Sequence, residues 1–199
     1  ASAFLGTKGD KNFPQDSLNY RAERGVSAFD IRQRTAAAYV IAMPGERWWQ
    51  RDLQLRGIAT LQSAPPFTPI LRFDNSNTGN TGGTFGSDRP NLIANPVLDK
   101  PTPDRWFNVG AFSTPAQYTF GTSGRNVVRG DGLANFDLAV SKRFALREQH
   151  SLTFEAQSFN LLNHANFELP DVYADEPAFG RILAAKSPRQ FQFALRYSF

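Results

Sequence analysis

The C-terminal segment of the sequence alternates strictly between two kinds of side chain. From Phe191 to Phe199 every odd position holds a large apolar residue, and every even position holds a polar or small one. Successive side chains of a β-strand point to opposite faces, so this segment has one apolar face and one polar face. Helical spacing fits the pattern less well. Residues 189–199 are therefore predicted to form a strand.

Four further segments show the same period of two, at residues 32–43, 52–63, 135–146 and 150–162. Each is roughly ten residues long, the length that a tilted strand needs to cross a lipid bilayer. Lys142 interrupts the apolar side of the third segment near one end. The sequence predicts an all-β chain of antiparallel strands.

Short and long connections alternate along these strands. Compact turns are expected around Pro44–Trp49 and around residues 147–149, whereas residues 67–134 form a long segment rich in Gly, Asn, Pro and Thr. Outer-membrane β-barrels have short periplasmic turns and long extracellular loops, and a soluble sandwich has no reason to be so lopsided. We expect 67–134 to be an extracellular loop region with local order around its aromatic residues, Trp106, Phe107, Phe112 and Phe120.

Aromatic residues mark both ends of this predicted topology. Trp48 and Trp49 are expected at the periplasmic rim, although covering a core at a hairpin is the alternative. The final strand has the pattern of the closing strand of an outer-membrane barrel, although a soluble edge strand is the alternative. Its apolar face is interpreted as a signal for the barrel assembly machinery, formed by Phe191, Phe193, Leu195, Tyr197 and Phe199.

The polar faces of the strands are expected to line the lumen of a barrel. Charges there either pair across strands or bind a plug and solute, and pairing is favoured because neighbouring strands bring such side chains within reach. The candidate lumen-facing residues are Arg34, Arg56, Asp137, Arg143, Glu155, Gln157 and Arg196.

Composition excludes several other classes. The 22 basic and 18 acidic residues give a net charge of +4 and are scattered, so no nucleic-acid partner is expected. The sequence has no cysteine and no apolar run long enough for a membrane-spanning helix. Met43 is its single methionine, so the chain is expected to be a processed product, a fragment or an excerpt.

Three motifs resemble sites but lack essential parts. His150 and His164 are not spaced as a metal pair, and Asp74–Gly79 begins like a calcium loop but has Phe85 where the bidentate glutamate belongs. Residues 121–125 are glycine-rich without the lysine of a phosphate loop, and are expected to form a tight loop with positive φ. We predict no catalysis, no metal and no cofactor.

Several motifs in fixed order resemble the C-terminal end of the large TonB-dependent receptor-like proteins, the Oar-like group with a carboxypeptidase-regulatory-like domain. They are residues 35–43, 57–69, 106–112, 120–130, 159–167 and 179–182. The resemblance covers nearly all of residues 1–199 and implies the last strands of a 22-stranded barrel. It also implies partners: the remaining barrel and plug, outer-membrane lipid, and TonB through the part of the protein absent here.

The function expected from the sequence is binding and TonB-dependent import of an unidentified solute across the bacterial outer membrane. A structural or adhesive surface barrel without transport is one alternative, and a soluble β-rich binding module is another. The sequence identifies neither the solute nor the oligomeric state.

Overall fold

The computed structural model describes residues 14–79, 88–147 and 149–199, and it divides the chain into two compact units. We call one of them the sheet unit; it comprises residues 33–63, 132–166 and 186–199. We call the other the loop unit; its described part comprises residues 14–32, 64–79, 88–131 and 167–185. No helix in the described part of the chain is long and apolar enough to cross a membrane.

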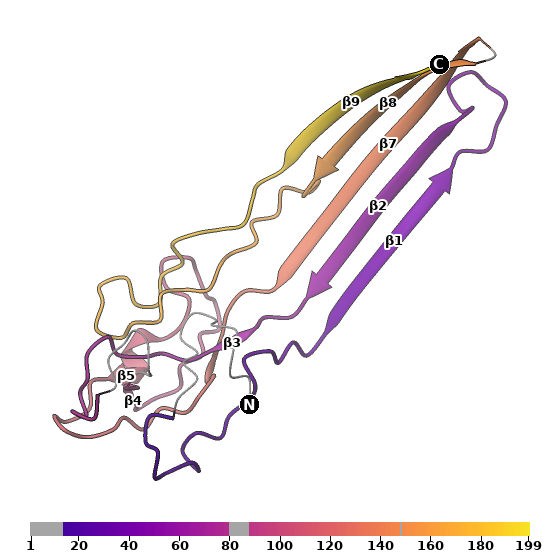
Figure 1. The fold of residues 1–199 in the computed structure, drawn as a ribbon. Coiled ribbons are helices and arrows are strands. Elements are labelled where there is room, and N and C mark those ends of the chain that lie inside the picture. The colour runs from indigo at the N-terminus through magenta and orange to yellow at the C-terminus, as the bar shows by residue number, and fades with distance from the viewer. Residues whose placement is uncertain (1–13, 80–87, 148) are drawn as a thin grey trace. The chain divides into compact units, whose positions relative to one another are not determined.

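The sheet unit is one antiparallel sheet of five long strands in the order β1-β2-β7-β8-β9 (Figure 1). When only the five long strands are counted, strands that are neighbours in the sheet are also consecutive in the sequence. The sheet is open, because β1 and β9 each have a single neighbour among the described strands. The strands are β1 (Arg34–Ala42), β2 (Leu53–Gln62), β7 (Leu133–Arg147), β8 (His150–Phe159) and β9 (Gln190–Ser198).

Each long strand lies in a segment that alternates in the sequence, and the register keeps the two faces separate across the sheet. Leu55 pairs with Ile41 on one side and with Val140 on the other, so apolar residues stand beside apolar residues. On the opposite face, Arg56 pairs with Val40 and Ala139. A slip of one residue would exchange the faces, so the alternation itself specifies this register.

Strand β8 ends earlier than the predicted residue 162. Asn160 and Asn163 both have φ of 50°, a left-handed conformation that ends an extended strand. The Asn160 side chain closes the loop, because its Oδ1 accepts from the His164 N–H and its Nδ2 donates to the His164 carbonyl. The backbone of His164 therefore takes part in shaping the loop.

The turn between β1 and β2 is held by the lysine that interrupts the apolar face. Lys142 on β7 donates from Nζ to the carbonyl oxygens of Trp48 and Arg51. Two carbonyls of a turn that has no ladder partner are satisfied in this way, so the lysine sits at the end of the apolar face and serves the turn. Trp48 itself is exposed.

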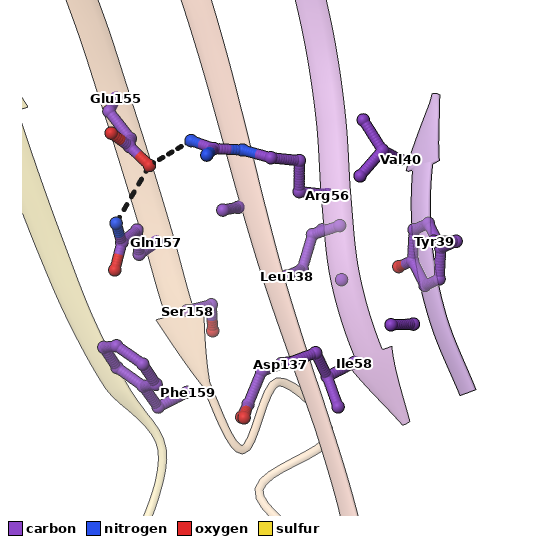
Figure 2. Close-up of a pocket in the computed structure, with 13 residues that line it drawn as sticks. Tyr39, Val40, Arg56, Ile58, Asp137, Leu138, Glu155, Gln157, Ser158 and Phe159 are labelled. Atoms are coloured by element: carbon purple, nitrogen blue, oxygen red, sulfur yellow. Dashed lines mark hydrogen bonds and ion pairs between the residues drawn. The ribbon is translucent and has the colours of Figure 1, made fainter. Parts of the chain in front are cut away.

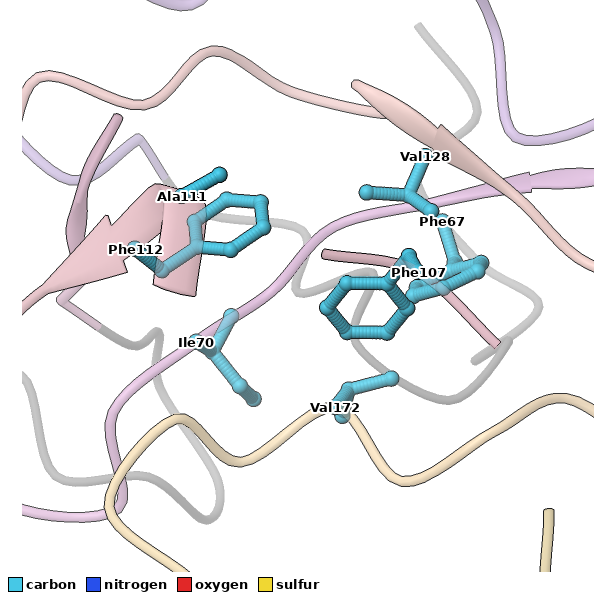
Figure 3. Packing of buried hydrophobic residues seen from close by; sticks show 7 residues of the cluster. All are labelled: Phe67, Ile70, Phe107, Ala111, Phe112, Val128 and Val172. Carbon is cyan, nitrogen blue, oxygen red and sulfur yellow. The ribbon is translucent and has the colours of Figure 1, made fainter. Parts of the chain in front are cut away.

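The loop unit has its own apolar core, although it contains little regular structure. Figure 3 shows the buried side chains gathered in one cluster: Phe67, Ile70, Phe107, Ala111, Phe112, Val128 and Val172. Phe107 makes edge-on contacts with Phe112 and Phe179, at ring-centre distances of 5.7 and 5.0 Å. Burying one such ring contributes roughly 1.5 to 3 kcal/mol, so the cluster holds irregular backbone in place.

Short pairings and one tight turn frame this core. β3 (Pro66–Phe67) pairs with β6 (Val128–Arg129), and β4 (Asn91–Leu92) pairs with β5 (Phe112–Ser113). The 3-10 turn η1 (Val109–Ala111) precedes β5. In residues 14–79, 88–147 and 149–199 this is the only helical element.

The expected local order around Trp106, Phe107 and Phe112 is present, but the packed region does not coincide with the predicted one. Phe120 is half-buried and lies outside the apolar cluster. Residues 167–185, which lie outside the predicted 67–134 region, contribute Val172 and Phe179 to the same packing. Distant segments therefore build one unit, which local sequence patterns do not reveal.

The prediction for the glycine-rich segment is also wrong. Positive φ was expected at residues 121–125, but neither Gly121 nor Gly124 has it. Gly121 is needed for space instead, because a Cβ there would lie 1.8 Å from the carbonyl oxygen of Arg89. The left-handed residue that follows is Asn126, with φ of 55°.

Candidate functional site on the polar face of the sheet

Three polar side chains meet in the middle of the polar face of the sheet (Figure 2). Glu155 Oε1 on β8 accepts from Arg56 Nη2 at 2.5 Å and from Gln157 Nε2 at 2.9 Å. Arg56 belongs to β2, so its guanidinium reaches across β7 to make this ion pair. Ala139 and Ser141 are the β7 residues that stand between the partners, and their small side chains leave the path open.

Asp137 on β7 lies on the same face, beside Ile58 in the register. Its Oδ1 accepts from Asn135 Nδ2 and from the Asn160 N–H, both at 2.9 Å. Among the described residues its carboxylate forms no ion pair. Asp137 thus fixes the end of β8 with one oxygen and carries an uncompensated negative charge on the polar face.

These groups surround a depression of about 360 Å³. Apolar side chains of the first two strands form its other side: Val40 is 69% exposed and Ile58 is 52% exposed. Figure 2 shows Ile58 close to Asp137, with Val40 beyond Arg56. The site therefore combines an apolar wall with carboxylates, an amide and one guanidinium.

The structure brings together only some of the candidate lumen-facing residues. Arg56, Asp137, Glu155 and Gln157 line the depression. Arg143 and Arg196 lie toward another end of the sheet, where both are register partners of Thr153, and Arg34 lies opposite Gln62. All seven share one face of the sheet. The expected cross-strand ion pair is found for Arg56 and Glu155, while a role in lining a lumen stays a prediction.

The other face of the sheet is an exposed apolar surface. On β9, Phe191 and Phe193 expose 60% and 68% of their surface, and Leu195 and Tyr197 are also exposed. Across the register, Phe193 stands beside Ala156 and Leu195 beside Phe154. A continuous apolar face of this kind is unfavourable in water and suits a lipid environment.

A comparison with protein-family models identifies the family of the chain that forms this two-faced sheet. The family described as "Outer membrane beta barrel domain" matches residues 1–192. The chain belongs to this family. No curated protein and no solved structure matches it. As an outer membrane β-barrel domain, the protein is located in the outer membrane of a bacterium, which accounts for the exposed apolar face.

The barrel assignment also explains the two incomplete edges. In a lipid bilayer, each unpaired backbone group of an edge strand costs several kcal/mol, so membrane-spanning sheets close on themselves. The outer edges of β1 and β9 have no partner among the described residues. We therefore propose that further strands beside both complete the barrel.

The loop unit of the barrel domain contains a buried ionic cluster that sequence patterns missed. Glu23 accepts from Arg89 through both carboxylate oxygens, at 2.9 and 2.8 Å, and its Oε2 also accepts from Arg125 Nε. Burial alone would raise the pKa of Glu23, but hydrogen bonds and charge from the two arginines outweigh it and lower the pKa. No local motif announces these residues, which lie far apart in the sequence.

Polar contacts also fix the remainder of segment 14–32. Gln15 donates from Nε2 to the Gly121 carbonyl and accepts the Arg89 N–H at its Oε1. Asn126 Nδ2 donates to the Val26 carbonyl at 2.8 Å. The segment is therefore held to the apolar part of the loop unit mainly through hydrogen bonds and charges.

The segment that resembles a calcium loop is organised by its own backbone. Burial alone would raise the pKa of Asp74, but hydrogen bonds from the N–H groups of Gly79 and Thr78 and from Ser76 Oγ together outweigh it and lower the pKa. These donors use both carboxylate oxygens. The position of Phe85 lies outside the described residues.

Neither His150 nor His164 belongs to a metal-binding cluster of the described residues. In the described ranges of the chain, no group of three or more His, Cys, Asp or Glu side chains is arranged to hold a metal ion. His150 instead places Nδ1 at 2.6 Å from the Tyr197 hydroxyl, with the two rings stacked.

Proposed function

We propose that this chain is part of the wall of an outer-membrane receptor that binds a solute and imports it with energy supplied through TonB. The plug and the TonB-contacting segment would belong to the rest of the protein. The motifs quoted above, which resemble TonB-dependent receptor-like proteins, support this assignment. So does membership of the outer membrane beta barrel domain family.

The observation that carries the proposal is the polar face of the sheet. In a barrel whose apolar face meets lipid, the opposite face lines the lumen. That face bears a cross-strand ion pair, an uncompensated carboxylate and a depression of about 360 Å³, which is a surface able to contact a solute. A barrel with a purely structural role needs no such depression.

The connections are consistent with a receptor. The links from β2 to β7 and from β8 to β9 supply residues of the packed loop unit, whereas the links at the other end of these strands are short turns. Long loops on one side of a barrel are the usual position of ligand-contacting surface.

The proposal is tested in the native bacterium with the full-length protein. One strain lacks the gene for this protein and a second lacks TonB, and depletion of solutes from the growth medium is followed by mass spectrometry. We expect at least one solute to remain undepleted in both strains. Complementation with the full-length gene restores its uptake only where TonB is present.

The alternative is an adhesive or structural surface barrel. For such a protein, deletion changes attachment of cells or integrity of the envelope and leaves every solute depleted as in the parent strain. That outcome would reject import. The soluble β-rich module is already excluded by the outer-membrane location of the family.

A further inference from the structure

The polar face of the sheet is not uniformly polar. On its β1 and β2 side, Ala36, Ala38, Val40 and Ile58 lie on this face together with polar residues such as Arg56 and Thr60, and these four side chains have no apolar cover among the described residues. On the β7 and β8 side the residues of this face are mostly hydrophilic, with Ala139, Ala145 and Phe159 as exceptions, and Ala139 and Phe159 also line the depression. An exposed apolar strip beside a polar strip favours a ligand that has the same two parts.

The charges of the site select the polar part of that ligand. Arg56 neutralises Glu155 through the ion pair, so Asp137 is left as the charge without a partner among the described residues. Asp137 and Ile58 are direct register partners, so their Cβ atoms lie about 4.5 to 5.5 Å apart. The carboxylate and the apolar side chain are therefore neighbours. A cationic group next to a short apolar body matches this pair.

Hydrogen-bonding capacity points the same way. Glu155 Oε1 accepts two hydrogen bonds, while Glu155 Oε2 and Gln157 Oε1 accept none from the described residues. Asp137 uses Oδ1 for two donors. The oxygens left over are acceptors that face a depression, and acceptors require a ligand with N–H or O–H donors.

We propose that this depression binds apolar amines, with the ammonium at Asp137 and the apolar body against Ile58 and Val40. This inference rests on the proposed function, because it names the class of solute that such a receptor binds at its wall. Buried area alone would admit any apolar compound. The uncompensated carboxylate distinguishes an amine from a carboxylate of the same size.

The test is protection of a thiol in the purified full-length protein in detergent. These 199 residues contain no cysteine, so Val40→Cys places one reactive group at the apolar wall once any cysteine elsewhere in the full-length protein has been replaced by serine. Its rate of modification by a charged methanethiosulfonate reagent is measured with phenylbutylamine or with phenylbutyrate. We expect the amine to slow modification several-fold and the carboxylate to have no effect.

Two variants serve as controls. Arg196→Cys lies on the same face of the sheet on β9, beside Thr153 and away from the depression, and neither probe should protect it. Asp137→Asn, added to Val40→Cys, keeps an acceptor oxygen for Asn135 and the Asn160 N–H. It should raise the amine concentration for half-protection about fivefold, as expected from losing about 1 kcal/mol of attraction between charges in water.

Each contrary result overturns the inference. Equal protection by both probes would show that Asp137 does not select the amine. No protection by either probe would show that the depression does not bind the amine. A thiol at position 40 that does not react even without a probe would mean that another part of the protein covers the strip. The assay involves neither TonB nor uptake, so a site that binds amines in a protein without transport would refute only the proposed function.

Discussion

Single residues of the loop unit carry constraints that their chemistry alone does not suggest. Gly121 is required because the backbone of Arg89 passes too close for any Cβ. Glu23 is required because its carboxylate compensates two guanidinium groups, and the side chain of Arg89 is only 4% exposed. In both cases one residue holds together segments that are distant in the sequence.

We predict that Gly121→Ala disrupts the loop unit. The new Cβ would overlap the Arg89 carbonyl oxygen, and backbone on both sides must shift, which is a clash that flexible side chains cannot relieve. The matched control is Gly110→Ala, where the nearest atom to a Cβ is Asn108 Oδ1 at 3.5 Å. Limited proteolysis of the full-length protein should show faster cleavage for the first variant and unchanged cleavage for the second.

A second residue-scale prediction concerns acid. The pKa of Glu23 is lowered in the folded protein, so the stability it contributes is present above the unfolded pKa of about 4.3 and is lost as the pH falls through the folded value. Protection of the amide hydrogens of residues 15–30, expressed relative to the intrinsic exchange rate at each pH, should therefore be high at neutral pH and fall below about pH 4.

The variant Glu23→Gln separates this effect from general acid unfolding. It leaves Arg89 buried without its carboxylate, and breaking a buried ion pair from one side costs roughly 3 to 5 kcal/mol. Protection of residues 15–30 should be low at neutral pH and show no step in the acid range. An unchanged step in the variant would assign the acid sensitivity to other groups.

At the scale of elements, the strands are specified by alternation, and their ends are specified by other means. The extent of β8 depends on Asn160 and on the oxygen that Asp137 offers it, which a reading of period two cannot detect. In the sequence, Lys142 interrupts an apolar face without an evident reason. The structure supplies the reason, because Lys142 donates to a carbonyl oxygen of the turn between β1 and β2.

Strand β9 carries the prediction for assembly. Phe191, Phe193, Leu195 and Tyr197 form its exposed apolar face, and Phe199 continues the alternation. We expect Phe199→Ala in the full-length protein to lower the amount inserted in the outer membrane several-fold. One aromatic contributes only roughly 1.5 to 3 kcal/mol, so the inserted molecules should keep near-normal heat resistance.

The control for this prediction is Gln192→Ala on the polar face of β9, which should insert normally. Quantitative immunoblotting of outer-membrane fractions gives the amount inserted, and mobility of heated and unheated samples gives heat resistance. Normal insertion with a lower melting temperature would show that Phe199 acts through packing, and the interpretation as an assembly signal would be wrong.

At the scale of the whole molecule, the open sheet predicts that these 199 residues do not form an independent soluble protein. Two unpaired strand edges and an exposed apolar face remain after all described contacts are made. Expressed alone, the chain should aggregate or require detergent. A detergent-free monomer with one cooperative thermal transition, measured by sedimentation and calorimetry, would contradict this.

Topology gives a further prediction for intact cells. If residues 67–134 are extracellular, trypsin should cut at exposed sites such as Arg72 and Arg105. Arg47 and Arg51 are also exposed, but they lie in the turn predicted to be periplasmic and should resist until the outer membrane is permeabilised. Cleavage at Arg47 in intact cells with Arg105 protected would reverse the topology.

The sequence predicts the sheet well because alternation is a local property of each strand. It predicts the site in part: the register that places Arg56 near Glu155 follows from the faces, but the reach across β7 depends on Ala139 and Ser141 being small. It does not predict the loop unit, because the contacts of Glu23 with Arg89 and of Phe107 with Phe179 join distant segments without a periodic signal.

The composite nature of the loop unit restricts how such a protein can diversify. Its apolar cluster takes Phe67 and Phe107 from one connection and Val172 from another, while Glu23 on a third segment meets Arg89. Exchanging any one loop for that of a relative would leave a cavity or an unpaired buried charge in the other two. New surface specificities should therefore arise by replacing the exposed tips or by exchanging all three segments together.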